Sequence, residues 1–272
     1  MSKYLGSKKH SVNVWSGKKI SQRDDIVAEE YPIALVFNGI SHAVMMGSPN
    51  DLESFSVGFS LNEGIVNSIE DIHDIEIKQS DAGLEISLRI SNQCFADLKD
   101  RRRSLVGRTG CGICGTESLE KLRIPTEPIS SEANVSHSAI NNAVRQLRKY
   151  QPLQEITGSV HGAAWCSKKG EIIELLEDVG RHNALDKLIG TLAMKKMLVE
   201  EHLNNGFLLV SSRASYEMVQ KASAANISVL VAVSAPTTLA IDMADSLGIT
   251  LIGFARETRH VCYSHMRRLG SL

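Results

Sequence analysis

The fold is decided by residues 206–254, which read GFLLVSSRASYEMVQKASAANISVLVAVSAPTTLAIDMADSLGITLIGF. Three short apolar runs of strand length alternate here with two segments whose apolar residues recur at helical spacing. Such alternation is typical of right-handed βαβ crossovers on a mainly parallel sheet. The pattern therefore predicts strands at 207–211, 229–234 and 250–254 and helices at 214–225 and 237–247.

The ends of these predicted strands are the places to look for a binding site. Ligands of such sheets generally bind beyond the C-terminal ends of the strands. Arg213, Arg256 and Arg259 fall in those positions. A single arginine at a strand end is as often a solvated surface residue as a ligand, but three at one edge favour an anion-binding site.

Upstream of this stretch, the pattern continues as a helix and a hairpin. Residues 140–150 carry apolar side chains at helical spacing, and the runs 159–166 and 171–176 predict two paired strands. Asp178 is the candidate cap of the next helix. Residues 126–272 are therefore expected to form one three-layer α/β domain that carries the predicted binding site.

The predicted helix after Asp178 begins with a basic segment, Arg181-His182-Asn183, just after Gly180. Backbone N–H groups at a helix start, together with an arginine, can hold a phosphate. His182 is included among the candidate binding residues on this ground. A lone histidine is more often a hydrogen-bonded structural residue than a catalyst, so neither His182 nor His161 is assigned an acid–base role.

The N-terminal half has a different pattern, of short apolar runs bounded by turn residues, which predicts a small α+β domain. Asn38-Gly39 between two runs is a hairpin signal, because both residues tolerate positive φ. Leu52 to Leu61 is expected to be one helix, with Asn50 as candidate cap. The predicted strands are 33–37, 42–46, 72–77 and 84–90.

The overall composition limits the class of protein. The 272 residues are 43% hydrophobic and 22% charged, with a formal net charge of -1, which predicts a globular chain and argues against one that coats nucleic acid or anionic membranes. We expect an N-terminal tail at 1–20, a small α+β domain at 21–125 that ends in a cysteine-containing loop, and the α/β domain at 126–272. The fold class is α/β, or α+β over the whole chain.

The sequence also predicts where the protein works. No apolar h-region follows the N-terminal lysines, and the apolar run 229–233 is far shorter than the roughly 20 residues that cross a bilayer. Five cysteines form no evenly paired framework. These features favour a cytoplasmic protein in a reducing environment, with neither nucleic acid nor membrane among its partners.

The cysteine-containing loop, residues 107–116, reads GRTGCGICGT. Four glycines around Cys111 and Cys114 leave the backbone pliable and the sulfurs accessible. Nearby arginines, among them Arg108, and the N–H groups of a helix expected near Thr116 lower a thiol pKa. Such a thiolate can accept a sulfur atom from another protein as a persulfide and hold it.

Three rival kinds of site fit the residues of this loop less well. A structural zinc site needs four ligands, and Cys94, His137 and His161 complete one only in an irregular arrangement. A thioredoxin-like motif normally lies inside a βαβ unit, and none is predicted here. Residues 110–115 match the GxGxxG pattern of dinucleotide-binding proteins, but no strand is predicted before them. A phosphate-binding P-loop would need a lysine before Thr116.

Several motifs together resemble the FdhD family of formate dehydrogenase accessory sulfurtransferases. The resemblance implies that a cysteine desulfurase loads sulfur onto the protein, which passes it to a molybdenum bis(molybdopterin guanine dinucleotide) cofactor destined for the formate dehydrogenase apoprotein. It also implies a C-terminal domain similar in fold to cytidine deaminases. The motifs are residues 107–115, 157–164, 177–187, 213–217 and 234–256.

The resemblance also assigns site residues. The persulfide cysteine of the family corresponds to Cys111, and Cys114 is grouped with it. The segment that contacts the cofactor corresponds to Phe254, Ala255, Arg256, Glu257, Thr258 and Arg259, and the candidate set is completed by Arg213 and His182. Residues that differ from the usual family pattern are Ser212, Glu257 and Val261.

Two functions from different classes are compatible with these residues. In the first, the chain is a sulfurtransferase that holds no tightly bound metal of its own. In the second, it is a non-catalytic chaperone of the molybdenum cofactor, and its CxxC motif closes a structural metal site. Metal analysis distinguishes the two. The chaperone function would be favoured if the protein held one zinc ion per chain and if cysteine variants lost both the zinc and stability. A cofactor with two guanine ends would suit a homodimer with paired sites.

Overall fold

A six-stranded sheet in the order β12-β11-β10-β9-β7-β8 forms the centre of the C-terminal half. The structure, a computed structural model, describes residues 6–103 and 128–270. The three predicted strands β9, β10 and β11 are parallel, but the other pairings are antiparallel, so the sheet as a whole is mixed. The strands are β7 (His161–Ser167), β8 (Ile172–Asp178), β9 (Gly206–Val210), β10 (Val229–Ala232), β11 (Thr250–Gly253) and β12 (Val261–Cys262).

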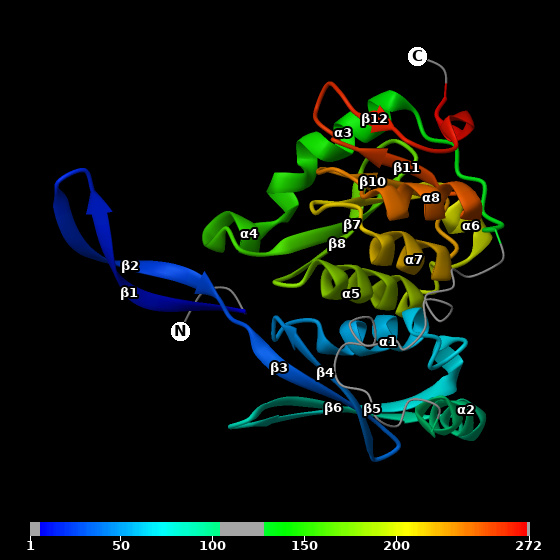
Figure 1. The fold of residues 1–272 in the computed structure, drawn as a ribbon, viewed down its shortest axis with the longest axis horizontal. Helices are drawn as coiled ribbons and strands as arrows, with labels where there is room; N and C mark the ends of the chain where they lie inside the picture. The colour runs from blue at the N-terminus through cyan, green and yellow to red at the C-terminus, as the bar shows by residue number, and fades with distance from the viewer. Residues whose placement is uncertain (1–5, 104–127, 271–272) are drawn as a thin grey trace.

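Helices cover both faces of this sheet, which gives the predicted three layers (Figure 1). On one face α3 (His137–Leu147) packs through Ile140 against apolar residues of β7, β9, β10 and β11. The other face carries α5 (Arg181–Met194), α7 (Tyr216–Ala224) and α8 (Thr238–Leu247). Shorter helices are η3 (Arg148–Tyr150), α4 (Pro152–Thr157), α6 (Glu200–Leu203) and η4 (Met266–Arg268).

A second sheet, in the order β4-β3-β6-β5, forms the N-terminal half. Helix α1 (Leu52–Asn62) packs on one of its faces, and its N-cap is Asp51 rather than the expected Asn50. Asn38 and Gly39 have φ of 46° and 81°, as the predicted hairpin turn requires. The other elements are β3 (Tyr31–Phe37), β4 (Ile40–Gly47), η1 (Ile69–Asp71), β5 (Ile72–Ser80), β6 (Gly83–Ile90) and α2 (Asn92–Arg103).

Residues 1–20 were predicted to be an N-terminal tail, but the described part of this segment forms regular structure from Ser7 onward. Strands β1 (Ser7–Ser16) and β2 (Lys19–Ala28) pair antiparallel along their whole length and extend away from the rest of the chain (Figure 1). Most of their side chains are exposed. The prediction was wrong because exposed strands lack the apolar alternation from which strands are recognised.

Helix α2 ends at Arg103, before the cysteine-containing loop predicted at residues 107–116. Four predictions fall on residues outside the described ranges. They are the two reactive cysteines Cys111 and Cys114, the helix expected near Thr116 and the domain boundary at residue 125. Within the described part of the chain, no helix combines the length and the apolar character needed to span a membrane.

The two halves meet where α1 crosses α5 (Figure 1). A Cβ atom on Gly58 would lie 1.8 Å from the backbone oxygen of Asp186, and one on Gly190 would lie 1.9 Å from that of Ser54. The hydroxyl groups of Thr191 and Ser54 are 3.0 Å apart across the same contact. Only glycine at these two positions allows the helix backbones to approach so closely.

A buried ion pair of the C-terminal half contacts the N-terminal half beside these two helices, through Ser48. The carboxylate of Asp178 lies 2.7 Å from Lys187 Nζ, and neither side chain is exposed. Asp178 also accepts a hydrogen bond from the backbone of Ser48, and Lys187 donates one to the Ser48 carbonyl. Asp178 was predicted as the cap of α5, but Gly180 occupies that position, and Asp178 accepts a hydrogen bond from the Gly180 backbone N–H at 2.8 Å.

We predict that Lys187→Met lowers the free energy of unfolding by about 3–5 kcal/mol, because it leaves the Asp178 carboxylate buried without its partner. The matched control is Lys195→Met, which removes an ion pair with Glu174 on the surface and should cost no more than about 1 kcal/mol. Urea denaturation of both variants measures the difference. Equal losses would contradict the structural role given to Lys187.

Candidate functional site

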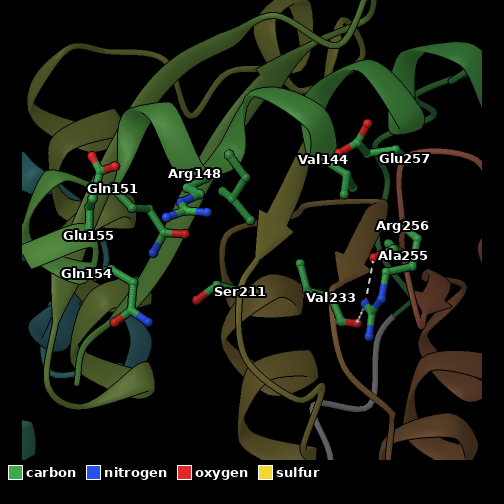
Figure 2. Close-up of a pocket in the computed structure, with 11 residues that line it drawn as sticks. Val144, Arg148, Gln151, Gln154, Glu155, Ser211, Val233, Ala255, Arg256 and Glu257 are labelled. Carbon is green, nitrogen blue, oxygen red and sulfur yellow. Dashed lines mark hydrogen bonds between the residues drawn. The ribbon is translucent and has the colours of Figure 1, made fainter. Parts of the chain in front are cut away.

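A groove crosses the C-terminal ends of β9, β10 and β11, at the edge of the sheet predicted to bind ligands. It consists of two hollows of about 450 and 350 Å³, which share Gln151, Gln154 and Ser211. These volumes lie in the range of small-molecule sites. Figure 2 shows the larger hollow, with Ser211 between Arg148 and Gln154 on one side and Val233 and Arg256 on the other.

The larger hollow has charged residues of both signs around an apolar floor. Arg148 and Arg256 lie on opposite sides of it (Figure 2). Glu155 and Glu257 add carboxylates at its rim, while Val144 and other apolar residues form part of the lining. The hollow therefore offers both cationic and anionic partners beside an apolar surface to a ligand.

The loop after β11 holds the six residues predicted to contact the cofactor. Phe254 has a φ of 50° and a side chain that is 42% exposed. Ala255 is buried in the core, whereas the side chains of residues 256–259 are exposed. The backbone N–H of Arg256 donates to the carbonyl of Arg259 at 2.7 Å, which closes the loop into a tight turn.

Two contacts of Arg256 and Glu257 fix this loop against its surroundings. The Arg256 guanidinium donates through Nη1 to the carbonyls of Val233 and Ala255. Arg145 Nε on α3 lies 3.5 Å from the Glu257 carboxylate, and both side chains are exposed. The loop is thereby tied to the end of β10 and to α3, the opposite wall of the groove.

Basic residues gather near the smaller hollow, which His161 helps to line. Burial lowers the pKa of His161 from its ordinary value of 6.5, and the positive charges of Arg181, His182 and Arg213 lower it further. The structure thus brings together the two predicted residues His182 and Arg213 with His161 and Arg181. Such a cluster favours an anion as its ligand.

Two side chains at the start of α5 are engaged within the protein. His182 contacts Glu217 on α7, and this hydrogen bond lowers the pKa of the Glu217 carboxyl. Asn183 Nδ2 donates to the Met46 carbonyl at 2.7 Å and to Asp178. Asn183 therefore serves the contact between the two halves, and His182 faces the groove edge only as part of a pair with Glu217.

Sequence reasoning missed the residues of α4 that form the wall shared by both hollows. The Glu177 carboxylate accepts hydrogen bonds from the backbone N–H groups of Leu153 and Gln154, at 2.9 and 2.8 Å, and so fixes the start of α4. Gln154 Oε1 in turn accepts from the backbone of Val160. A Cβ on Gly162 in β7 would lie 2.6 Å from Gln151 Nε2. A glycine inside a predicted strand was therefore a signal in the sequence that another segment packs closely there.

The cysteines that the structure describes are not exposed nucleophiles. Cys94 and Cys166 are 3% and 0% exposed, which confirms that they are packed, and burial raises the pKa of the Cys166 thiol. Cys262 is partly buried and donates to the Ser264 carbonyl. Among the described residues, no three or more His, Cys, Asp or Glu side chains are grouped as metal ligands.

The chain belongs to the FdhD/NarQ family, whose model matches residues 28–270. A relative named sulfur carrier protein FdhD, from Cupriavidus necator, is 51% identical over 260 residues, which cover 95% of this chain and 88% of that protein. A crystal structure of a proposed formate dehydrogenase accessory protein from Desulfotalea psychrophila matches with a TM-score of 0.76 at 24% identity. That match covers 97% of this chain and 99% of the other, and it shows the shared fold.

These comparisons confirm the family resemblance and the α/β class. The likeness of the C-terminal domain to cytidine deaminases stays a prediction, as do the roles of the individual site residues. The family, the fold and the groove are therefore the features on which a function can rest.

We predict that Arg213→Gln raises the pKa of His161 toward 6.5, because the substitution removes a positive charge that disfavours the protonated imidazole. Arg148→Gln is the matched control, since Arg148 is not among the charges that act on His161. Histidine resonances followed by NMR across a pH titration measure the shift. An unchanged His161 pKa in the Arg213→Gln variant would show that the Arg213 charge does not act on His161.

Proposed function

We propose that this protein is a sulfurtransferase that accepts sulfur as a persulfide on Cys111 and delivers it to a molybdenum bis(molybdopterin guanine dinucleotide) cofactor bound in the groove. The observation that carries the proposal is a groove with basic residues at both ends in a chain of the FdhD/NarQ family. The name of the Cupriavidus necator relative, a sulfur carrier protein, supports the same chemistry.

The groove fits the chemistry of such a substrate. Phosphate groups need cations and backbone donors, which Arg148, Arg256 and the cluster around His161 supply. A guanine base needs hydrogen-bonding side chains beside an apolar surface, and Gln151 and Gln154 lie where the two hollows join. His161 is held neutral by burial and by its basic neighbours, so a bound anion would raise its pKa and favour the protonated form.

The family resemblance is the ground on which the sulfur transfer is assigned to Cys111 and not to Cys114, because both cysteines share the same basic surroundings in the sequence. The Cys111 thiolate attacks the terminal sulfur of a persulfide on a cysteine desulfurase, a new S–S bond forms, and the donor cysteine leaves as a thiolate. Arg108 lies three residues before Cys111 and favours the thiolate form. When a bound cofactor in its reduced state accepted the terminal sulfur, the S–S bond would break and Cys111 would leave as a thiolate. The transferred sulfur would take two electrons from the acceptor as its new bond forms.

The proposal includes the partners and the compartment. A cysteine desulfurase is the donor, and the formate dehydrogenase apoprotein receives the sulfurated cofactor. The cytoplasm is the proposed site of action, because a free thiolate persists in a reducing compartment.

We expect Cys111→Ala to abolish the gain of one sulfur atom when the protein is incubated with a cysteine desulfurase and cysteine. Mass spectrometry of the peptide that contains residue 111 measures the gain. The control Cys166→Ala should leave it unchanged, because Cys166 is fully buried. Sulfur still accepted by Cys111→Ala at another cysteine would refute the role of Cys111, provided that thermal unfolding shows an intact fold.

Guanosine diphosphate is a suitable probe of the groove. Arg148→Gln and Arg256→Gln should each weaken its binding by about 10- to 100-fold, the effect of losing one charged hydrogen bond. Arg267→Gln is the control, because Arg267 is an exposed cation that pairs with Glu132. Calorimetric titration measures the affinities. Equal affinity in the wild type and all three variants would show that the nucleotide does not bind in the groove.

A further inference from the structure

The loop between β11 and β12, residues 254–260, contributes to one wall of the groove and has no regular structure of its own. Its two ends are joined by the pairing of β11 with β12. Between these ends Ala255 is buried, but the side chains of Phe254 and of residues 256–259 are exposed. The position of Arg256 in the groove therefore depends on the polar contacts that hold the loop.

A pair of histidines ties the end of this loop to α3. His260 is the last residue of the loop, and His137 is the first residue of α3. Nδ1 of His137 lies 2.7 Å from Nε2 of His260, and the planes of the two rings are 16° apart. In such a hydrogen bond one ring donates an N–H and the other accepts it with a lone pair. Both side chains are half-buried.

The α3 side of this contact is fixed by packing and capping. The Ser136 side chain caps the helix by accepting a hydrogen bond from the backbone N–H of Ala139 at 3.1 Å, and Ile140 is fully buried against the sheet. A second contact further along α3, between Arg145 and Glu257, joins two exposed side chains and so contributes little. The end of the loop is therefore the part that the histidine pair holds in place.

The bond between the two histidines depends on how many protons the pair carries. A neutral ring carries one proton, so a neutral pair has one proton in the bond and one on an outer nitrogen. A further proton must fill the remaining outer nitrogen, so that Nδ1 of His260 carries an N–H. That nitrogen is buried and has no hydrogen-bond partner among the described residues. A second further proton would set two N–H groups against each other and break the bond.

The surroundings of His260 keep the pair neutral. Burial lowers the pKa of His260 from its ordinary value of 6.5, and the charge of a protonated His137 lowers it further. On the loop, the charged side chains of Arg256 and Glu257 are engaged with backbone carbonyls and with α3. On β12, burial raises the pKa of the Cys262 thiol, which stays neutral. The bond is therefore present at neutral pH and is lost as the pH falls through the lowered pKa of His260.

We propose that His137 and His260 form a pH-sensitive clasp that holds the loop of residues 254–260 against α3 and so positions Arg256 in the groove. His260 is a positioning residue, because it acts through the loop. The inference rests on the proposed function, in which the groove takes a guanine nucleotide end of the cofactor. The neutral clasp keeps the wall of the groove in place, and protonation releases it, so the groove holds the nucleotide more weakly in acid.

The clasp is tested first without a ligand, by hydrogen exchange of the Arg256 backbone N–H, which bonds to the Arg259 carbonyl. At about pH 7.5, His260→Leu should speed this exchange by about 3- to 10-fold, the effect of losing one neutral hydrogen bond. His260→Gln should exchange like the wild type, because its side-chain amide can donate to or accept from His137 Nδ1. At about pH 5 the wild type should exchange faster than His260→Gln, whose amide does not titrate. His202→Leu is the control, because His202 is exposed on α6, which precedes the start of β9.

Guanosine diphosphate then tests the consequence for the groove. At about pH 7.5, His260→Leu should bind it about 3- to 10-fold more weakly than the wild type, and His260→Gln should bind it equally well. The ratio of the wild-type Kd to the Kd of His260→Gln isolates the titration of the clasp, because His161 and the phosphates titrate in both proteins. This ratio should rise from about 1 at about pH 7.5 to about 3–10 at about pH 5.

Two results would overturn the clasp. The first is an Arg256 exchange rate that is the same in the wild type and in His260→Leu, and the second is a Kd ratio that does not change between the two pH values. The proposed function fails separately from the clasp. If the loop opens in His260→Leu and in acid but guanosine diphosphate binds to none of the proteins, the nucleotide site is wrong and the clasp stands.

Discussion

The buried ion pair of Asp178 and Lys187 is the interaction on which the arrangement of the rest depends. Both side chains are removed from water, and each charge offsets the cost of burying the other. The loss of one side chain leaves an unpaired charge in the interior. Asp178 ends β8 and Lys187 lies in α5, while Ser48, which bonds to both, follows the N-terminal sheet. One pair therefore fixes a strand, a helix and the junction of the two halves.

The groove follows from that constraint. With the end of β8 fixed, the neighbouring Glu177 carboxylate lies where it caps α4, and α4 forms the wall shared by both hollows. The start of α5 brings Arg181 and His182 to the same edge as Arg213 after β9. These neighbouring positive charges lower the pKa of His161 and destabilise the edge when no ligand is bound. A bound anion would offset them.

Much of the fold was readable from local sequence because its signals are local. The alternation over residues 206–254 predicted the strands and helices that carry the groove, and Asn38-Gly39 predicted a turn, since periodicity and positive φ depend on neighbouring residues alone. The prediction failed for the arm formed by β1 and β2, whose exposed strands carry little apolar alternation. It failed also for Asp178, whose carboxylate accepts bonds from Ser48 and from the side chains of Asn183 and Lys187 instead of forming the N-cap of α5.

The sequence by itself determined the family, the α/β class, the buried state of Cys94 and Cys166, and the arginines at the strand ends. Only the tertiary structure decided that Glu177, Asp178 and Lys187 of one short motif hold the fold together, while Arg181 and His182 of the same motif act on His161. It also decided that Gln151, Gln154 and Ser211 line that groove. The physical reason is that a hydrogen-bonded or charged side chain takes its role from its partner, and these partners lie far away in the sequence.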